Sequence, residues 1–131
     1  MKNTINYSRH HIDKNDILEV SKVLKSDFLT QGPTVKKFED KIKKYLGVKF
    51  SIAVNSATSG LHLACLSLGI KKNDIVWTTP NSFVSTANCV IHCGAQIDFV
   101  DINLDTYNIC PDLLERKLEK KKKKKLPKVI I

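Results

Sequence analysis

The chain has 131 residues, 42% of them hydrophobic, which is enough for one domain with a modest core. No apolar run approaches membrane-spanning length and the first residues lack a signal-peptide core, so we expect a cytoplasmic protein with no membrane partner. The net charge of +9 suggests nucleic-acid binding, but one run of six lysines, Lys120 to Lys125, supplies most of it. No aromatic residues are interleaved with that run, so we expect a solvated surface loop and no specific nucleic-acid partner.

Helical and strand patterns alternate along the chain, which predicts an α/β fold with a mainly parallel sheet and flanking helices. In chain order, the sequence first predicts a helix that Asp13 caps, a loop over 26–32 and a helix from Pro33 that Gly47 ends. A strand over 50–54, a helix over 61–68, a strand over 75–79 and a helix over 82–93 are predicted next. The last predicted elements are a strand over 97–100, a helix over 111–119 and a strand that follows Pro127.

The last predicted strand ends the sequence on the apolar residues Val129, Ile130 and Ile131, with no polar exit and no crossover helix. We therefore expect an incomplete sheet and the front portion of a longer protein. A frameshift near the lysine run is one hypothesis for the break.

The four cysteines show neither a CxxC pair nor the spacing of zinc ligands. They are Cys65, Cys89, Cys93 and Cys110. We expect buried reduced thiols and no metal site, because free cysteine packs like a small hydrophobe.

A turn of small and hydroxyl residues between the predicted strand over 50–54 and the next helix is the strongest local signal. Its residues are Ser56, Ala57, Thr58, Ser59 and Gly60. The first turn of a helix has unpaired backbone N–H groups and the positive end of the helix dipole, so this turn predicts an anion site for a phosphate-bearing ligand. The alternative is a plain helix cap, because serine and threonine are common caps and most such turns bind nothing.

Five stretches of the sequence, in this order and spacing, resemble the sugar aminotransferases of the DegT/DnrJ/EryC/StrS type. They are SDFLTQGP at 26–33, NSATSGL at 55–61, TPNSFVSTAN at 79–88, GA at 94–95 and FVDI at 99–102. Within that family, NSATS at 55–59, VWT at 76–78, NC at 88–89 and CGA at 93–95 most resemble the branch that acts in pseudaminic acid biosynthesis.

The resemblance implies a fold type I enzyme that binds pyridoxal phosphate (PLP), with residues 1–32 as an N-terminal helix and loop and residues 33–131 as part of the PLP-binding large domain. It implies that Ala57 and Thr58, with Ser56 beside them, hold the cofactor phosphate. It also implies that Phe83 stacks on the pyridine ring, whereas the residues alone favour a core position on a helix. Thr30 and Asn88 would lie near the substrate.

The reaction that the resemblance implies is transfer of an amino group from glutamate to a UDP-linked 4-keto-6-deoxy sugar, by an enzyme that forms a homodimer. The family's Schiff-base lysine lies beyond residue 131, and no lysine of this chain sits in its motif, so we assign no catalytic residue and expect the 131 residues alone to be inactive. Two other hypotheses remain open, namely a basic polyanion-binding module and a non-functional remnant.

Overall fold

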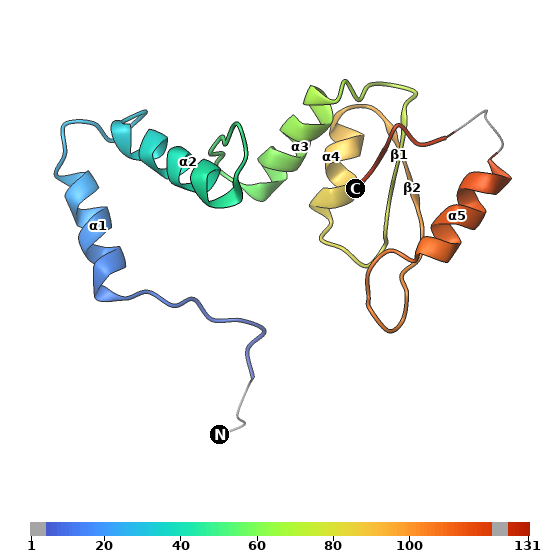
Figure 1. Ribbon diagram of the computed structural model, residues 1–131, viewed down its shortest axis with the longest axis horizontal. Helices are drawn as coiled ribbons and strands as arrows, with labels where there is room; N and C mark the ends of the chain where they lie inside the picture. Colours follow the sequence, from blue (N-terminus) through green and yellow to red (C-terminus); the bar gives the residue numbers. More distant parts are fainter. Residues whose placement is uncertain (1–4, 122–125) are drawn as a thin grey trace. The chain divides into compact units, whose positions relative to one another are not determined.

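The computed structural model describes residues 5–121 and 126–131, and the chain divides into two compact units, Met1–Ala53 and Val54–Ile131 (Figure 1). The first unit holds helix α1 (Lys14–Leu24) and helix α2 (Pro33–Leu46). The second holds the sheet and three helices. Each unit is described by itself.

Helix α1 begins, and helix α2 begins and ends, where the sequence predicts. The side chain of Asp13 accepts hydrogen bonds from the backbone N–H groups of Asn15 and Asp16, at 2.7 and 3.1 Å, and the Asp16 carboxylate accepts from the Asp13 N–H at 2.9 Å. This reciprocal capping box fixes the start of α1. Helix α2 ends at Gly47, whose φ of 65° is left-handed and suits glycine.

The strand predicted over residues 50–54 is wrong. The segment is extended but pairs with no other strand in the part of the chain that the structure describes. Its backbone meets a side chain instead, since the N–H of Ala53 donates to Oε1 of Glu39 at 2.9 Å. Phe50 and Ile52 are exposed. An apolar β-branched run becomes a strand only where a neighbouring ladder satisfies its backbone, so the pattern alone was insufficient.

The described part of the second unit contains a parallel sheet, as predicted, with three strands in place of the four expected. Its strands are β1 (Ile75–Thr78), β2 (Gln96–Phe99) and β3 (Val129–Ile130), in the order β2-β1-β3. The flanking helices are α3 (Ala57–Ser67), α4 (Ser85–His92) and α5 (Pro111–Lys120). Helix α4 lies on one side of β1 and β2 and α5 on the other in Figure 1, which confirms the predicted architecture of a parallel sheet between helices.

Successive residues of β1 build the two sides of the core. Val76 is fully buried and pairs in register with Ile97 and Val129, on the face that α3 and α4 cover. Trp77, also fully buried, points to the other face because side chains alternate along a strand. There Lys117 of α5 lies with Nζ 4.7 Å from the centre of the indole ring.

Lys117 also pairs with Asp98 of β2, Nζ to Oδ1 at 2.8 Å. Burial of the Asp98 carboxyl raises its pKa, but the hydrogen bonds from Lys117 and from the backbone N–H of Phe99 outweigh burial and hold that pKa below its ordinary value. This pair attaches α5 to the sheet.

The cysteines are free thiols. Cys65 of α3 and Cys89 of α4 are buried, with their sulfur atoms 3.6 Å apart, while Cys93 and Cys110 are half-buried. Burial, and then the hydrogen bond with Cys89, raises the pKa of Cys65 to about 11. The thiols at the contact of α3 and α4 therefore behave as packing groups.

The lysine run is not wholly a loop. Lys120 is the last residue of α5 and Lys121 follows as its C-cap. Residues 122–125, on which the rest of the predicted surface loop falls, lie outside the described residues. The predicted loop began one residue too early, because lysine is a good helix former and is favoured in the last turn.

Candidate functional site

The first turn of α3 begins four residues earlier than the sequence pattern predicted. Ser56 is its N-cap and accepts a hydrogen bond from the N–H of Ser59 at 3.1 Å. The N–H groups of Ala57 and Thr58 donate to no protein atom in the described parts of the chain. Ser56 therefore has the capping role that the sequence left open, and two adjacent amides remain at the positive end of the helix.

The N-terminal ends of α3 and α4 meet through a pair of hydroxyls. Thr58 Oγ1 lies 2.8 Å from Ser85 Oγ, across 27 residues of sequence. Ser85 is the first residue of α4, which begins three residues later than predicted, because the chain from Pro80 to Val84 first makes a bend. Ser85 is only 6% exposed. The two helix dipoles thus direct their positive ends to one place.

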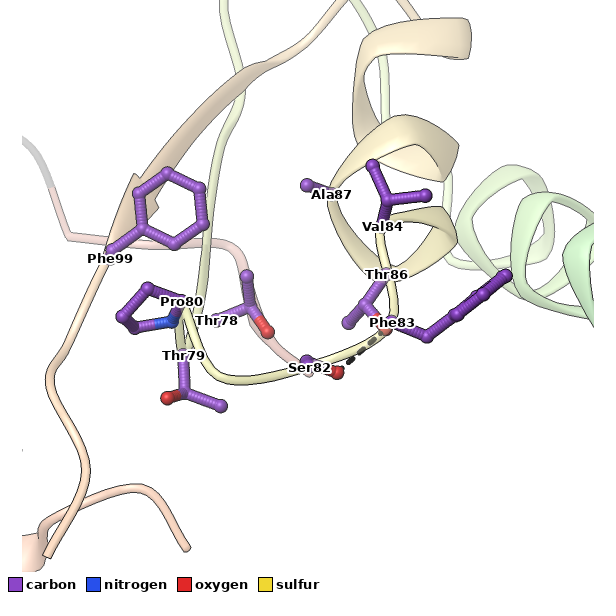
Figure 2. A pocket seen from close by; sticks show the side chains of 9 residues that line it. All are labelled: Thr78, Thr79, Pro80, Ser82, Phe83, Val84, Thr86, Ala87 and Phe99. Carbon is purple, nitrogen blue, oxygen red and sulfur yellow. Dashed lines mark hydrogen bonds between the residues drawn. The ribbon is translucent and has the colours of Figure 1, made fainter. Parts of the chain in front are cut away.

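A pocket of about 240 Å³ lies where β1 and β2 end and the chain turns toward α4 (Figure 2). Val84 and Thr86, the chain neighbours of Ser85, line it, but Ser85 and Thr58 do not. Its lining residues are Thr78, Thr79, Pro80, Ser82, Phe83, Val84, Thr86, Ala87 and Phe99. Phe99 and Ala87 stand on facing sides of it in Figure 2. The carboxyl ends of parallel strands are where α/β proteins place their ligands.

Phe83 is at this pocket but is not a core residue. It precedes α4, lines the pocket and is 75% exposed. An exposed aromatic face beside a pocket can stack on a flat ring, so the structure is compatible with the role that the resemblance implies.

The other predicted site residues do not line the pocket. Ser56 and Ala57 are exposed on the first turn of α3. Asn88 is exposed on α4, and Thr30 is exposed on the loop between α1 and α2, in the other unit. Their binding roles stay predictions.

Sequence reasoning missed the hydroxyl residues at the end of β1 and the start of α4. Thr78 is buried and donates to the carbonyl of Ile131 at 3.0 Å, while Thr79 has a buried Oγ1 with no partner among the described residues. Ser82 and Thr86 share a hydrogen bond of 3.1 Å between their side chains, drawn in Figure 2. The signal that could have found them is the Thr-Thr pair at a strand's carboxyl end.

The donors at the start of α3 suit a phosphate group. They are the amides of Ala57 and Thr58 and the Thr58 hydroxyl, whereas at α4 the N–H groups of Thr86 and Ala87 already donate to the carbonyls of Phe83 and Val84. Neither first turn contains an acidic residue that would repel an anion. No group of three His, Cys, Asp or Glu residues within 5–121 and 126–131 is arranged to hold a metal ion. No helix in that part of the chain is long and apolar enough to cross a membrane.

Comparison with known proteins finds, over nearly the whole chain, the family that the sequence motifs resemble. The model of the DegT/DnrJ/EryC1/StrS aminotransferase family matches residues 10–131. A UDP-4-amino-4,6-dideoxy-N-acetyl-beta-L-altrosamine transaminase of Campylobacter jejuni is 47% identical over 88% of this chain and 30% of its own length. The chain spans 30% of the length of the first curated relatives it matches.

Solved structures agree in fold. Spr1654 from Streptococcus pneumoniae in its PLP form has a TM-score of 0.80 and 31% identity, covering 86% of this chain and 29% of that one. A DegT DnrJ EryC1 StrS aminotransferase from Brucella abortus has a TM-score of 0.79 and 33% identity, covering 87% of this chain and 31% of that one. The chain therefore belongs to the DegT/DnrJ/EryC1/StrS aminotransferase family.

Proposed function

We propose that this chain is the front part of a PLP-dependent nucleotide-sugar aminotransferase and that it anchors the cofactor through its phosphate. The observation that carries this proposal is the contact of Thr58 with Ser85, which brings two helix N-termini together beside the pocket. The PLP form of the similar Streptococcus pneumoniae structure supports the choice of cofactor.

Each predicted residue has a definite task in this proposal. The amides of Ala57 and Thr58 donate to the phosphate and the Thr58 hydroxyl adds a third donor, while Ser56 keeps the helix start in place. Phe83 presents its ring face to the pyridine ring. When bound, PLP supplies the electron sink for transfer of an amino group.

We also propose the substrates that the resemblance in sequence implies. Glutamate is the amino donor, and the acceptor is a UDP-linked 4-keto-6-deoxy sugar of the pseudaminic acid type. The name of the similar Campylobacter jejuni transaminase, which contains a UDP-linked amino sugar, supports the nucleotide-sugar class. Thr30 and Asn88 serve the sugar substrate in a cytoplasmic homodimer. The division of the enzyme at residue 33 belongs to the same proposal.

A polypeptide of these 131 residues alone is proposed to be inactive, because none of its lysines lies in the family's Schiff-base motif. The test is an absorbance spectrum of the purified chain with PLP, before and after glutamate is added. A glutamate-dependent spectral change that requires one lysine of this chain would overturn the proposal of inactivity.

Phosphate anchoring is tested by binding of pyridoxamine 5′-phosphate, which has no aldehyde and so cannot condense with surface lysines. We expect Thr58→Val to weaken its binding to the 131-residue chain about tenfold or more, since a hydrogen bond to a charged group is lost. We expect Phe83→Ala to weaken binding as well, because the side chain that stacks on the pyridine ring is removed.

Two controls make this test specific. Thr34→Val makes the same change in the first turn of α2, in the other unit, and should bind like the wild type. Pyridoxamine without phosphate should bind far more weakly than the phosphate ester. Equal affinity for the two compounds, or no effect of Thr58→Val, would refute phosphate anchoring at α3.

A further inference from the structure

Ser85 presents a buried hydroxyl with a single protein partner. It is 6% exposed, and in the described parts of the chain the one hydrogen-bond partner of its Oγ is Thr58 Oγ1, at 2.8 Å. A buried hydroxyl without a partner is costly, so this contact holds both side chains in place. Either atom can be the donor.

The direction of this hydrogen bond is decided by what Thr58 faces. A hydroxyl has one hydrogen to donate and can accept two. If Thr58 gives its hydrogen to a phosphate oxygen, the hydrogen between the two side chains must come from Ser85. The reverse direction would turn a lone pair of Thr58 toward the anion.

We propose, resting on the proposed function, that Ser85 is a positioning residue for cofactor binding. It donates to Thr58 Oγ1 and so directs the Thr58 O–H toward the phosphate. Without Ser85, Thr58 Oγ1 has no hydrogen-bond partner left among the described residues, so nothing in the protein fixes the direction of its O–H. The chain of two hydroxyls also polarises, which strengthens the outer hydrogen bond to a charged acceptor.

The experiment is a double-mutant cycle on binding of pyridoxamine 5′-phosphate to the full 131-residue chain. The variants are Ser85→Ala, Thr58→Val and the two combined, and Ser67→Ala is the control, because Ser67 is exposed at the far end of α3. We expect Ser85→Ala to weaken binding about three- to tenfold, the range of one hydrogen bond. We expect no further loss when it is added to Thr58→Val, since Ser85 acts through Thr58.

Two further readouts separate positioning from folding. Affinity for pyridoxamine, which lacks the phosphate, should not change in Ser85→Ala, and the ³¹P NMR signal of the bound ester should shift relative to the wild type. Thermal melting of each variant shows whether the fold persists. The role through Thr58 is overturned if Ser85→Ala loses affinity for both compounds. It is also overturned if Ser85→Ala weakens binding as much in the Thr58→Val protein as in the wild type.

The outcomes also separate this inference from the proposed function. If the wild-type chain binds the ester no better than pyridoxamine, phosphate anchoring fails and the inference fails with it. If the wild type binds the ester and Thr58→Val weakens binding while Ser85→Ala binds like Ser67→Ala, only the inference is overturned.

Discussion

Val90 offers the sharpest test of how α4 is held against the sheet, and therefore of what keeps the two helix starts together. It is fully buried in the cluster that also contains Cys65, Val76 and Cys89. The next residue, Ile91, is 52% exposed on the same helix. The pair allows burial to be compared with side-chain size.

We expect Val90→Ala to lower the free energy of unfolding of the second unit by about 2 kcal/mol. Two methyl groups leave the core at about 0.8 kcal/mol each, and the cavity they leave adds to that loss. The higher helix propensity of alanine offsets about half a kcal/mol. For a domain of this size the midpoint of thermal unfolding should fall by about 10 °C.

The assay can follow Trp77, the single tryptophan of the chain, which is fully buried in the same unit. Its fluorescence reports urea unfolding of that unit directly. Ile91→Ala removes more carbon atoms but from a half-exposed site, so it should cost under about 1 kcal/mol. If Ile91→Ala costs as much as Val90→Ala, the assignment of the buried face of α4 is wrong.

Three further predictions concern charge, thiols and glycines. Because the pKa of Asp98 is below its ordinary 3.8, the extra stability of the wild type over Asp98→Asn should be fully present above about pH 4 and disappear as the pH falls further. The measurement is the difference in melting temperature between the two proteins at each pH, and a difference that grows toward acid would contradict this. Because burial raises the pKa of Cys65, iodoacetamide at about pH 8 should label Cys110 in the native chain well before Cys65. Peptide mass spectrometry measures the two labelling rates, and equal rates would place Cys65 at the surface. Gly60→Ala should stabilise the second unit by up to about 1 kcal/mol, because the added carbon meets only a methyl of Val54 at 3.5 Å. Gly94→Ala, at a φ of 71°, should destabilise the same unit by about 1 kcal/mol or more. Urea titrations that rank the two variants the other way would refute the reasoning.

Helices α1 and α2 were predictable because the signals at their starts, and at the end of α2, are local, whereas α3 and α4 start four and three residues away from the predicted positions. Asp13 and Pro33 start the first two helices within one residue of the predicted positions, and Gly47 ends the second in the left-handed conformation that glycine adopts at little cost. The parallel sheet followed from the alternation of helix and strand patterns. The helix ends depend on a few consecutive residues, and the sheet on a repeated order of such local patterns, both of which a sequence displays directly.

Features that depend on distant partners were not predictable. Residues 50–54 have the composition of a strand, yet no described segment pairs with them, and no local pattern reports a missing neighbour. The contact of Thr58 with Ser85 joins positions 27 residues apart. The sequence placed Thr58 at a candidate anion site from its own turn, but it gave no reason to connect that turn to Ser85.

The parallel sheet explains why these two positions meet. Helix α4 connects parallel neighbours β1 and β2, so it must start at their carboxyl ends and return along the sheet. Helix α3 packs against α4, with Cys65 against Cys89 along their length and Thr58 against Ser85 at their starts. Both dipoles consequently point their positive ends to the edge where the strands end and the pocket lies. The phosphate-binding role that we propose thus follows from chain connectivity as much as from the turn, and a variant that tilts α4 should weaken binding without any change in the turn itself.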